Sequence, residues 1–178
     1  MVITTLHESI RSYQSIWPTE LTFKEQFLDL LNHPRAFHRD HLPGHITGSA
    51  WVLNENRTKV LLVHHAKLNR WLQPGGHADG DENVLAVALR ELEEETGVKN
   101  VKLLQSGIFD LDIHPIPTRK DFPLHDHYDV RFAVIANDQE PLIVSEESHD
   151  VKWVLLSELS RFNQDESIHR MAKKSSKF

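Results

Sequence analysis

One acidic stretch, Gly76 to Val98, constrains this chain more than any other feature. It reads GHADGDENVLAVALRELEEETGV. Its apolar residues Leu85, Ala88, Leu89 and Leu92 recur at helical spacing and give one apolar face. The stretch therefore predicts an amphipathic helix that packs against a core.

The ends of this helix are marked by residue type. Asp81 is the expected N-cap, and Glu82 lies in the first turn, where the helix dipole favours negative charge. Gly97 follows the last periodic residue and suits the left-handed conformation that ends many helices.

The acidic residues are concentrated at the end of the helix that disfavours them. Glu91, Glu93, Glu94 and Glu95 lie in the last turns, where the dipole prefers cations. Glu91, Glu94 and Glu95 share a face and repel one another. Two explanations remain open: a solvated run of charge, or a site for a hard divalent cation such as Mg²⁺, which takes oxygen ligands.

The spacing of the whole stretch matches a known signature. The order is Gly76, five residues, Glu82, seven residues, Arg90-Glu91-Leu92, one residue, Glu94-Glu95, one residue, Gly97-Val98. This resembles the complete signature of the Nudix hydrolase family, over roughly residues 46–160 of the chain. The resemblance implies an α/β fold, an α/β/α sandwich with a mixed sheet. It also implies hydrolysis of a nucleoside diphosphate linked to another group.

The resemblance also implies roles within the signature. Glu91, Glu94 and Glu95 would hold Mg²⁺, with Mn²⁺ as an alternative, and Gly76 would lend its carbonyl oxygen. Glu91 is instead the general base in some members. Arg90 would hold one of the carboxylates, or form a surface pair with Glu94.

Residues outside these core positions are weaker candidates. Glu82 would bind the metal through water, or only favour the start of the helix. Glu146 and Glu147 are candidates for an additional acid from a later loop, or belong to an ordinary solvated loop. Lys67 would reach a phosphate or be solvated, and Trp71 would pack or stack on a base.

Two later segments carry alternating polar residues, which a strand would place on one face. Asp110, Asp112 and His114 alternate in the first segment, and His125, His127, Asp129 and Arg131 alternate in the second. Three hypotheses follow if these strands pair. The face is exposed to solvent, or it lines a substrate pocket in which His127 takes part and Arg131 or Arg119 binds a phosphate. In the third, His114, His125 and His127 hold a transition metal such as Zn²⁺.

The remaining pattern gives an expected order of elements. Residues 1–45 form a helical extension, with one helix stopped by Pro18 and a second capped by Thr22. Residues 46–178 form the Nudix domain. Its strands are expected at 47–53, 59–64, 101–113, 127–136 and 151–156, with loops at 66–71 and 114–124 and a short helix near 164–173 before a frayed tail.

Composition narrows the class of protein. The 178 residues contain no cysteine, which excludes disulfides and cysteine nucleophiles and favours a reducing cytoplasm. No apolar run approaches the ~18 residues of a membrane span. The net charge of −6 argues against a nucleic-acid partner. We expect a small nucleotide as substrate and leave a homodimer open. A nucleotide-binding sensor and an RNA 5′-end pyrophosphohydrolase are the alternative functions.

Overall fold

The structure is a computed structural model that describes residues 5–118 and 122–178. The elements within these ranges are, in chain order, α1 (Leu6–Ser12), α2 (Pro18–Leu30), β1 (Gly44–Asn54), β2 (Lys59–His65), β3 (Arg70–Leu72), β4 (Gly75–His77), α3 (Val84–Thr96), β5 (Val101–Leu103), β6 (Asp110–Ile116), β7 (His125–Ala136), β8 (Ser148–Leu155), the 3₁₀ helix η1 (Leu156–Arg161) and α4 (Glu166–Ser175).

The strands form one mixed sheet around a parallel pair. β1 and β7 run parallel along the whole length of β1, from Gly44 opposite Asp126 to Asn54 opposite Ala136. β4 pairs antiparallel with β1, β6 and β5 pair with β7, and β8 and β3 pair with β2. The prediction of an α/β fold with a mixed sheet is confirmed.

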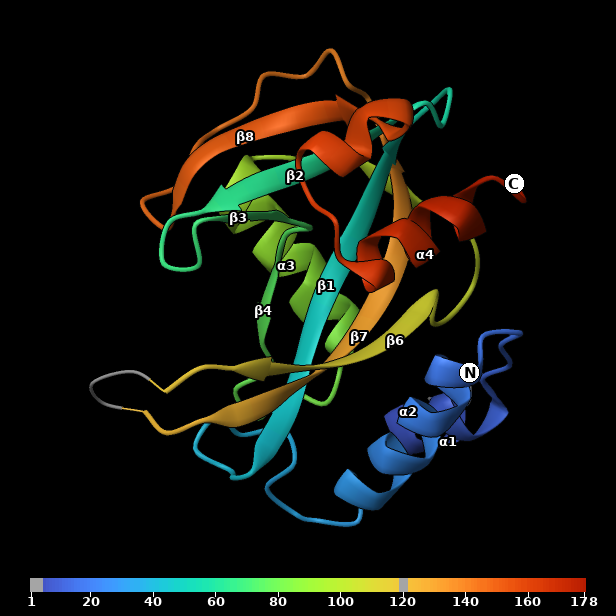
Figure 1. Cartoon of the computed structure of the whole chain (residues 1–178), viewed down its shortest axis with the longest axis vertical. Helices are drawn as coiled ribbons and strands as arrows, with labels where there is room; N and C mark the ends of the chain where they lie inside the picture. Colours follow the sequence, from blue (N-terminus) through green and yellow to red (C-terminus); the bar gives the residue numbers. More distant parts are fainter. Residues whose placement is uncertain (1–4, 119–121) are drawn as a thin grey trace.

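Helices cover both faces of the sheet, and β1 passes between α3 and α4 (Figure 1). Every residue of β1 is buried, and its alternating side chains enter two different clusters. Ala50 packs in the cluster that contains Leu92 of α3, whereas Trp51 packs in the cluster that contains Met171 of α4. A strand with helices on both sides explains why apolar residues are not confined to alternate positions.

The N-terminal helices share this core. Ile10 of α1 and Phe27 of α2 are fully buried and cluster with Ile46 of β1, Val84 of α3 and Val130 of β7. The expected boundary between residues 45 and 46 falls inside β1. The extension therefore packs as part of the same unit as the sheet.

Several expected helix ends are wrong. α1 ends at Ser12, and Pro18 begins α2 instead of stopping the first helix. Proline suits this position because N–H groups in the first turn of a helix have no hydrogen-bond partner within the helix. Proline, which has no N–H, therefore loses no hydrogen bond there. Thr22 consequently lies inside α2, and no side chain caps that helix. At the other end of the chain α4 continues to Ser175, whose buried hydroxyl accepts a hydrogen bond from Trp51 Nε1, so the expected frayed tail begins later.

The strand predictions need three corrections. The expected strand 101–113 is two strands, β5 and β6, separated by a turn in which Gly107 has a φ of +85°. β6 then extends to Ile116, into the expected loop. The short strand β4, at Gly75–His77, lies where no strand was predicted, since glycines disfavour strands.

Within the described ranges, the helices are too short or too polar for any of them to cross a membrane.

Candidate functional site

The acidic helix forms as α3, but it begins two residues later than expected. Asn83 is the N-cap, and its side chain accepts the Ala86 N–H at 3.2 Å. Asp81 instead accepts the Asn83 N–H at 2.9 Å and shapes the preceding turn. Gly97 ends the helix with a φ of +79°, as predicted. Glu82 therefore precedes the helix and is exposed.

Two of the glutamates lie against the glycines of β4. The Gly75 N–H donates to Glu95 Oε2 at 2.9 Å. A Cβ atom at Gly76 would come within 2.4 Å of Glu91 Cδ, so any side chain there would require the Glu91 carboxylate to move. The backbone of β4 thus packs directly against the Glu91 and Glu95 carboxylates of α3.

Burial makes these carboxylates difficult to ionise. Glu95 is 7% exposed, and burial is the main cause that raises its pKa to about 8, with the charges of Glu91 and Glu147 adding to the effect. Burial likewise raises the pKa of Glu91, although Arg90 opposes that shift. A divalent cation at this position would supply the positive charge that the pair needs.

Arg90 and Glu94 complete the acidic end of the helix. Arg90 Nη2 lies 3.1 Å from Glu91 Oε1, and Arg90 Nε lies 3.9 Å from Glu94 Oε1. Both contacts considered from the sequence are therefore present. The side chain of Glu94 is 62% exposed, which leaves its carboxylate accessible from solvent.

Of the two acids in the later loop, Glu147 interacts electrostatically with the glutamates of α3. Its charge raises the pKa values of both Glu91 and Glu95. Glu146 has no such relation in the described contacts, and both side chains are exposed.

The two candidates before β4 differ in their surroundings, and the expected loop at 66–71 is wrong at its end, because Trp71 belongs to β3. Lys67 is exposed. Trp71 is partly buried, and its ring stacks on His64 at 4.9 Å and meets Phe162 edge-on at 5.4 Å. Lys152 Nζ also lies 5.2 Å from the ring centroid. The indole of Trp71 thus contacts other side chains of the protein, which favours the packing alternative over base stacking.

The two polar strand faces do merge, because β6 and β7 pair. Asp110 lies opposite Arg131, Asp112 opposite Asp129 and His114 opposite His127. The part of this face that carries the aspartates and Arg131 is buried, with Asp110 0% and Arg131 3% exposed, whereas the side chain of His114 at its end is 39% exposed. The hypothesis of a solvated face is therefore wrong.

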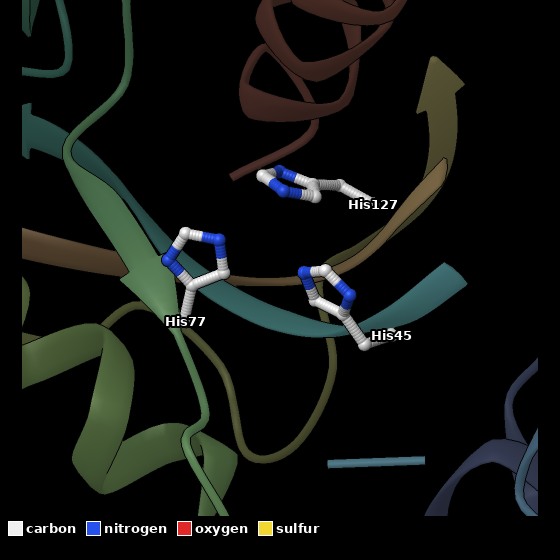
Figure 2. Close-up of side chains that lie close together, drawn as sticks. All are labelled: His45, His77 and His127. Atoms are coloured by element: carbon white, nitrogen blue, oxygen red, sulfur yellow. The ribbon is translucent and has the colours of Figure 1, made fainter. Parts of the chain in front are cut away.

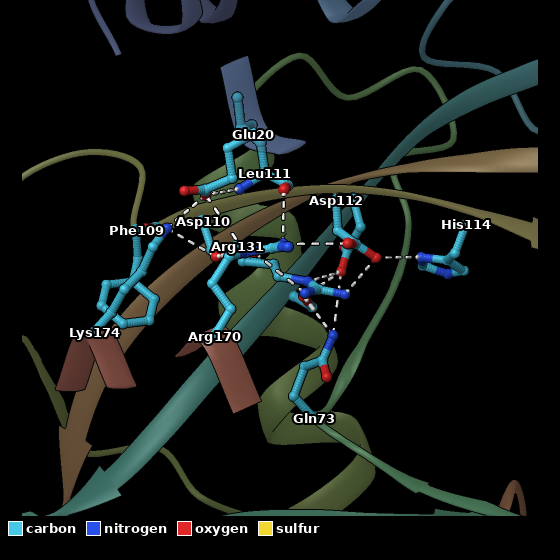
Figure 3. Close-up of polar contacts among 12 residues, drawn as sticks. Glu20, Gln73, Phe109, Asp110, Leu111, Asp112, His114, Arg131, Arg170 and Lys174 are labelled. Carbon is cyan, nitrogen blue, oxygen red and sulfur yellow. Dashed lines mark hydrogen bonds and ion pairs between the residues drawn. The ribbon is translucent and has the colours of Figure 1, made fainter. Parts of the chain in front are cut away.

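Arg131 is engaged by carboxylates from three positions (Figure 3). Its guanidinium donates to Asp129 at 2.8 Å, to Asp112 at 3.0 Å and to Asp110 at 3.2 Å. Burial disfavours its charge, but these carboxylates outweigh that effect and raise its pKa. A guanidinium held in this way does not suit the phosphate-binding role. Arg119, the other arginine considered for a phosphate, lies outside the described residues.

Three members of this network were not anticipated. Arg170 donates to Asp110 at 2.8 Å and 2.9 Å, and Lys174 bonds Asp110 at 2.8 Å and also contacts Glu20 (Figure 3). Glu20 accepts the Leu111 N–H at 3.1 Å. These residues come from α4 and α2, and no sequence pattern links those helices to the polar strands.

The histidines gather differently from the prediction. Of His114, His125 and His127, only His127 belongs to the group whose ring nitrogens lie within 4.8 Å of one another; its partners are His45 and His77 (Figure 2). His114 instead bonds Asp112 at 3.1 Å. Burial is the main cause that lowers the pKa of His77 to about 4 and that of His127 to about 2, so both imidazoles are neutral at pH 7.

The sequence did not indicate His45 and His77 as members of this group, and the reason lies in the topology of the sheet. His45 lies beside His127 because β1 and β7 are parallel, and His77 belongs to a strand of three residues. Neither the parallel pairing nor so short a strand leaves a periodic signal in the sequence.

Comparisons with curated proteins give partial matches. The chain is 32% identical over 98 residues to a protein named "Probable DHNTP pyrophosphohydrolase" from Lactococcus lactis, covering 53% of this chain and 56% of that protein. It is 28% identical over 117 residues to the Rattus norvegicus "Bis(5'-nucleosyl)-tetraphosphatase [asymmetrical]", covering 64% of this chain and 76% of that protein. It is 39% identical over 63 residues to a Bartonella tribocorum "RNA pyrophosphohydrolase", covering 34% of each. The chain thus spans about half the length of the first of these relatives and a third of the last.

Comparisons with solved structures support the fold. A C. elegans Ap4A hydrolase binary complex superimposes with a TM-score of 0.61 at 16% identity, over 75% of this chain and 96% of that one. A NUDIX-family hydrolase from Clostridium perfringens gives a TM-score of 0.56 at 22% identity, over 74% and 96%. The family model described as "NUDIX domain" matches residues 44–174. This match covers most of the chain and includes the whole of α3, so the protein belongs to the Nudix family.

Proposed function

We propose that this protein is a divalent-metal-dependent hydrolase of the phosphoric anhydride bond in a nucleoside diphosphate linked to another group. The observation that supports it most is the position of Glu91 and Glu95. Both carboxylates are at least partly buried, and both lie against the backbone of Gly75 and Gly76. Such a group has no structural benefit by itself, because burying carboxylates is costly.

The residues at this position fit Mg²⁺. Mg²⁺ prefers hard oxygen ligands, and Glu91, Glu94, Glu95 and the Gly76 carbonyl supply only oxygen. A cation would also remove the electrostatic cost of the raised pKa values. Mn²⁺ takes the same ligand types and would substitute for it.

The chain's own residues would position the reaction. A bound cation would neutralise phosphate oxygens, orient the substrate and lower the pKa of water. Arg90 would hold the Glu91 carboxylate in its rotamer through their 3.1 Å contact. Glu147, whose charge acts on Glu91 and Glu95, is the proposed acceptor of the proton from the attacking water. Glu91 is the alternative base.

We propose a small nucleotide as the substrate, either a nucleotide sugar, an ADP-ribose-like compound or a nucleoside triphosphate. The names of the relatives differ in substrate, so they do not select one. The net charge of −6 disfavours a long polyanion such as RNA. Lys67 is exposed and remains the proposed phosphate contact. The absence of cysteine supports a cytoplasmic location.

The proposal is tested by product analysis. The purified protein is incubated with Mg²⁺ or Mn²⁺ and a panel of nucleoside triphosphates, nucleotide sugars, ADP-ribose, dinucleoside polyphosphates and a 5′-triphosphorylated RNA. Glu95→Gln should lower kcat by at least about 100-fold, because it removes a charged metal ligand. Glu93→Gln is the matched control, since Glu93 lies on the same helix as Glu95 but is exposed and pairs with Lys99 beyond the helix end.

The two variants separate the outcomes. Retained activity in Glu93→Gln together with loss in Glu95→Gln supports the assignment. Full activity in Glu95→Gln, or binding of every compound without turnover in the wild type, would refute hydrolysis at this site.

A further inference from the structure

Three imidazoles from three strands meet on one face of the sheet (Figure 2). His45 of β1 is opposite His127 of β7, and His77 of β4 is opposite Thr47 of β1. Because side chains alternate along a strand, His45 and Thr47 lie on the same face, which brings His77 to the same side. The ring centroids of the three histidines are 5.0 to 5.2 Å apart.

His45 provides an independent sign of a ligand. It is 1% exposed, and its Nε2 is a buried nitrogen with no hydrogen-bond partner. Its Nδ1 lies 3.3 Å from the carbonyl oxygen of His41. A carbonyl at Nδ1 holds the proton there and leaves Nε2 as a lone pair, which is the usual arrangement of a metal-binding histidine. An unpaired buried nitrogen is otherwise a cost to the fold.

We propose that His45, His77 and His127 bind one transition-metal ion of the Zn²⁺ class, with water at the fourth position. Zn²⁺ takes imidazole nitrogens at about 2.0–2.1 Å in a tetrahedral arrangement, which places the nitrogens about 3.4 Å apart. The nitrogens of the three rings lie within 4.8 Å of one another. Rotation of the rings about their side-chain bonds would bring them the remaining distance.

The neighbouring groups are compatible with this set. His114 is not included because it does not belong to the group whose ligand nitrogens lie within 4.8 Å of one another. His125 stacks on His45 at 5.0 Å and its Nε2 lies 3.4 Å from His127 Nε2, so it borders the site. The nearby positive charge of Arg39 is neutralised by its ion pair with Asp79.

The site is distinct from the carboxylates of α3. In β4, Gly76 faces Glu91, and alternation turns His77 toward the opposite face of the sheet. A metal at the histidines would therefore join β4 to β1 and β7 from the side away from α3. This inference does not depend on the proposed hydrolase activity.

The experiment is a zinc titration of the full chain. The protein is stripped with a chelator and then competes with a chromogenic chelator for Zn²⁺, while Glu95→Gln tests whether the carboxylates contribute. We expect one tight equivalent of zinc in both proteins and a higher Tm with zinc. His45→Ala and His127→Ala should each weaken binding by at least about 100-fold, the upper end of the loss for an outer-shell partner alone.

His114→Ala is the matched control and should keep the zinc and the Tm shift. Circular dichroism of the zinc-free variants shows whether they fold, and His77→Gln provides a third, less disruptive variant. Absence of a tight equivalent in the wild type would overturn the proposal. Binding that persists in folded His45→Ala and His77→Gln, or that disappears in Glu95→Gln, would do the same.

Discussion

At the scale of single residues, Gly76 links the sheet to the acidic helix. The sequence identified this glycine through its position in the Nudix signature, and the structure gives the physical reason for it. Any side chain at Gly76 would overlap the carboxylate of Glu91, with a Cβ to Cδ distance of 2.4 Å. The glycine therefore sets how closely β4 approaches α3.

Gly76→Ala should lower kcat/KM by about 100-fold, because a displacement of about 1 Å at a reacting centre has an effect of that size. The dependence on Mg²⁺ concentration should move to higher values at the same time, since Glu91 would be pushed from its place. Steady-state kinetics across a Mg²⁺ titration measures both effects. An unchanged Mg²⁺ dependence would contradict the assigned geometry.

At the scale of elements, α3 was predictable from sequence and its start was not. Apolar periodicity and Gly97 located the helix and its end, because both are local signals. The prediction of Asp81 as N-cap was wrong, because residue type alone does not distinguish it from the equally suitable Asn83. Only backbone geometry selects Asn83, whose side chain accepts the Ala86 N–H.

Asn83→Ala should reduce the free energy of unfolding by about 1 kcal/mol through loss of the cap. Asn83→Asp is the control and should stay close to the wild type, since aspartate caps equally well. Chemical denaturation monitored by circular dichroism measures both variants. Equal loss in the two variants would show that the hydrogen bond at Ala86 is not the relevant contact.

At the scale of the whole molecule, a buried charge network joins α2 and α4 to the sheet. Glu20 of α2 and Arg170 and Lys174 of α4 meet the aspartates of β6 and Arg131 of β7 (Figure 3). Breaking such a network by removing one partner is strongly destabilising, because the remaining charges stay buried.

The network should make stability depend on pH in the acid range. Burial disfavours the ionised form of Asp112, but the charge of Arg131 and the hydrogen bond from His114 outweigh it and hold the pKa well below its usual range. A depressed pKa contributes stability that is present above the unfolded value, about 3.9, and is lost as the pH falls toward the folded value.

Asp112→Asn should therefore be less stable than the wild type at pH 7, by about 3 kcal/mol. The difference should shrink as the pH falls from about 4 toward 2, because unfolded wild type then takes up a proton at Asp112 while the folded protein still holds the ionised carboxylate. Urea denaturation at each pH gives the two curves. Parallel curves over this range would disprove the contribution of Asp112.

The sequence by itself determined the family, the acidic helix and its metal-ligand candidates, and the alternation of polar residues on two strands. These features depend on the spacing of residues within short segments, and such spacing can be read directly from the sequence. The tertiary structure decided what the polar residues face. In the structure, Arg131 is buried and bonds three aspartates. The histidines that lie close to His127 are His45 and His77, and not His114 and His125 as predicted. The physical reason is that parallel pairing and helix docking bring together residues far apart in the chain, and no periodicity records those contacts.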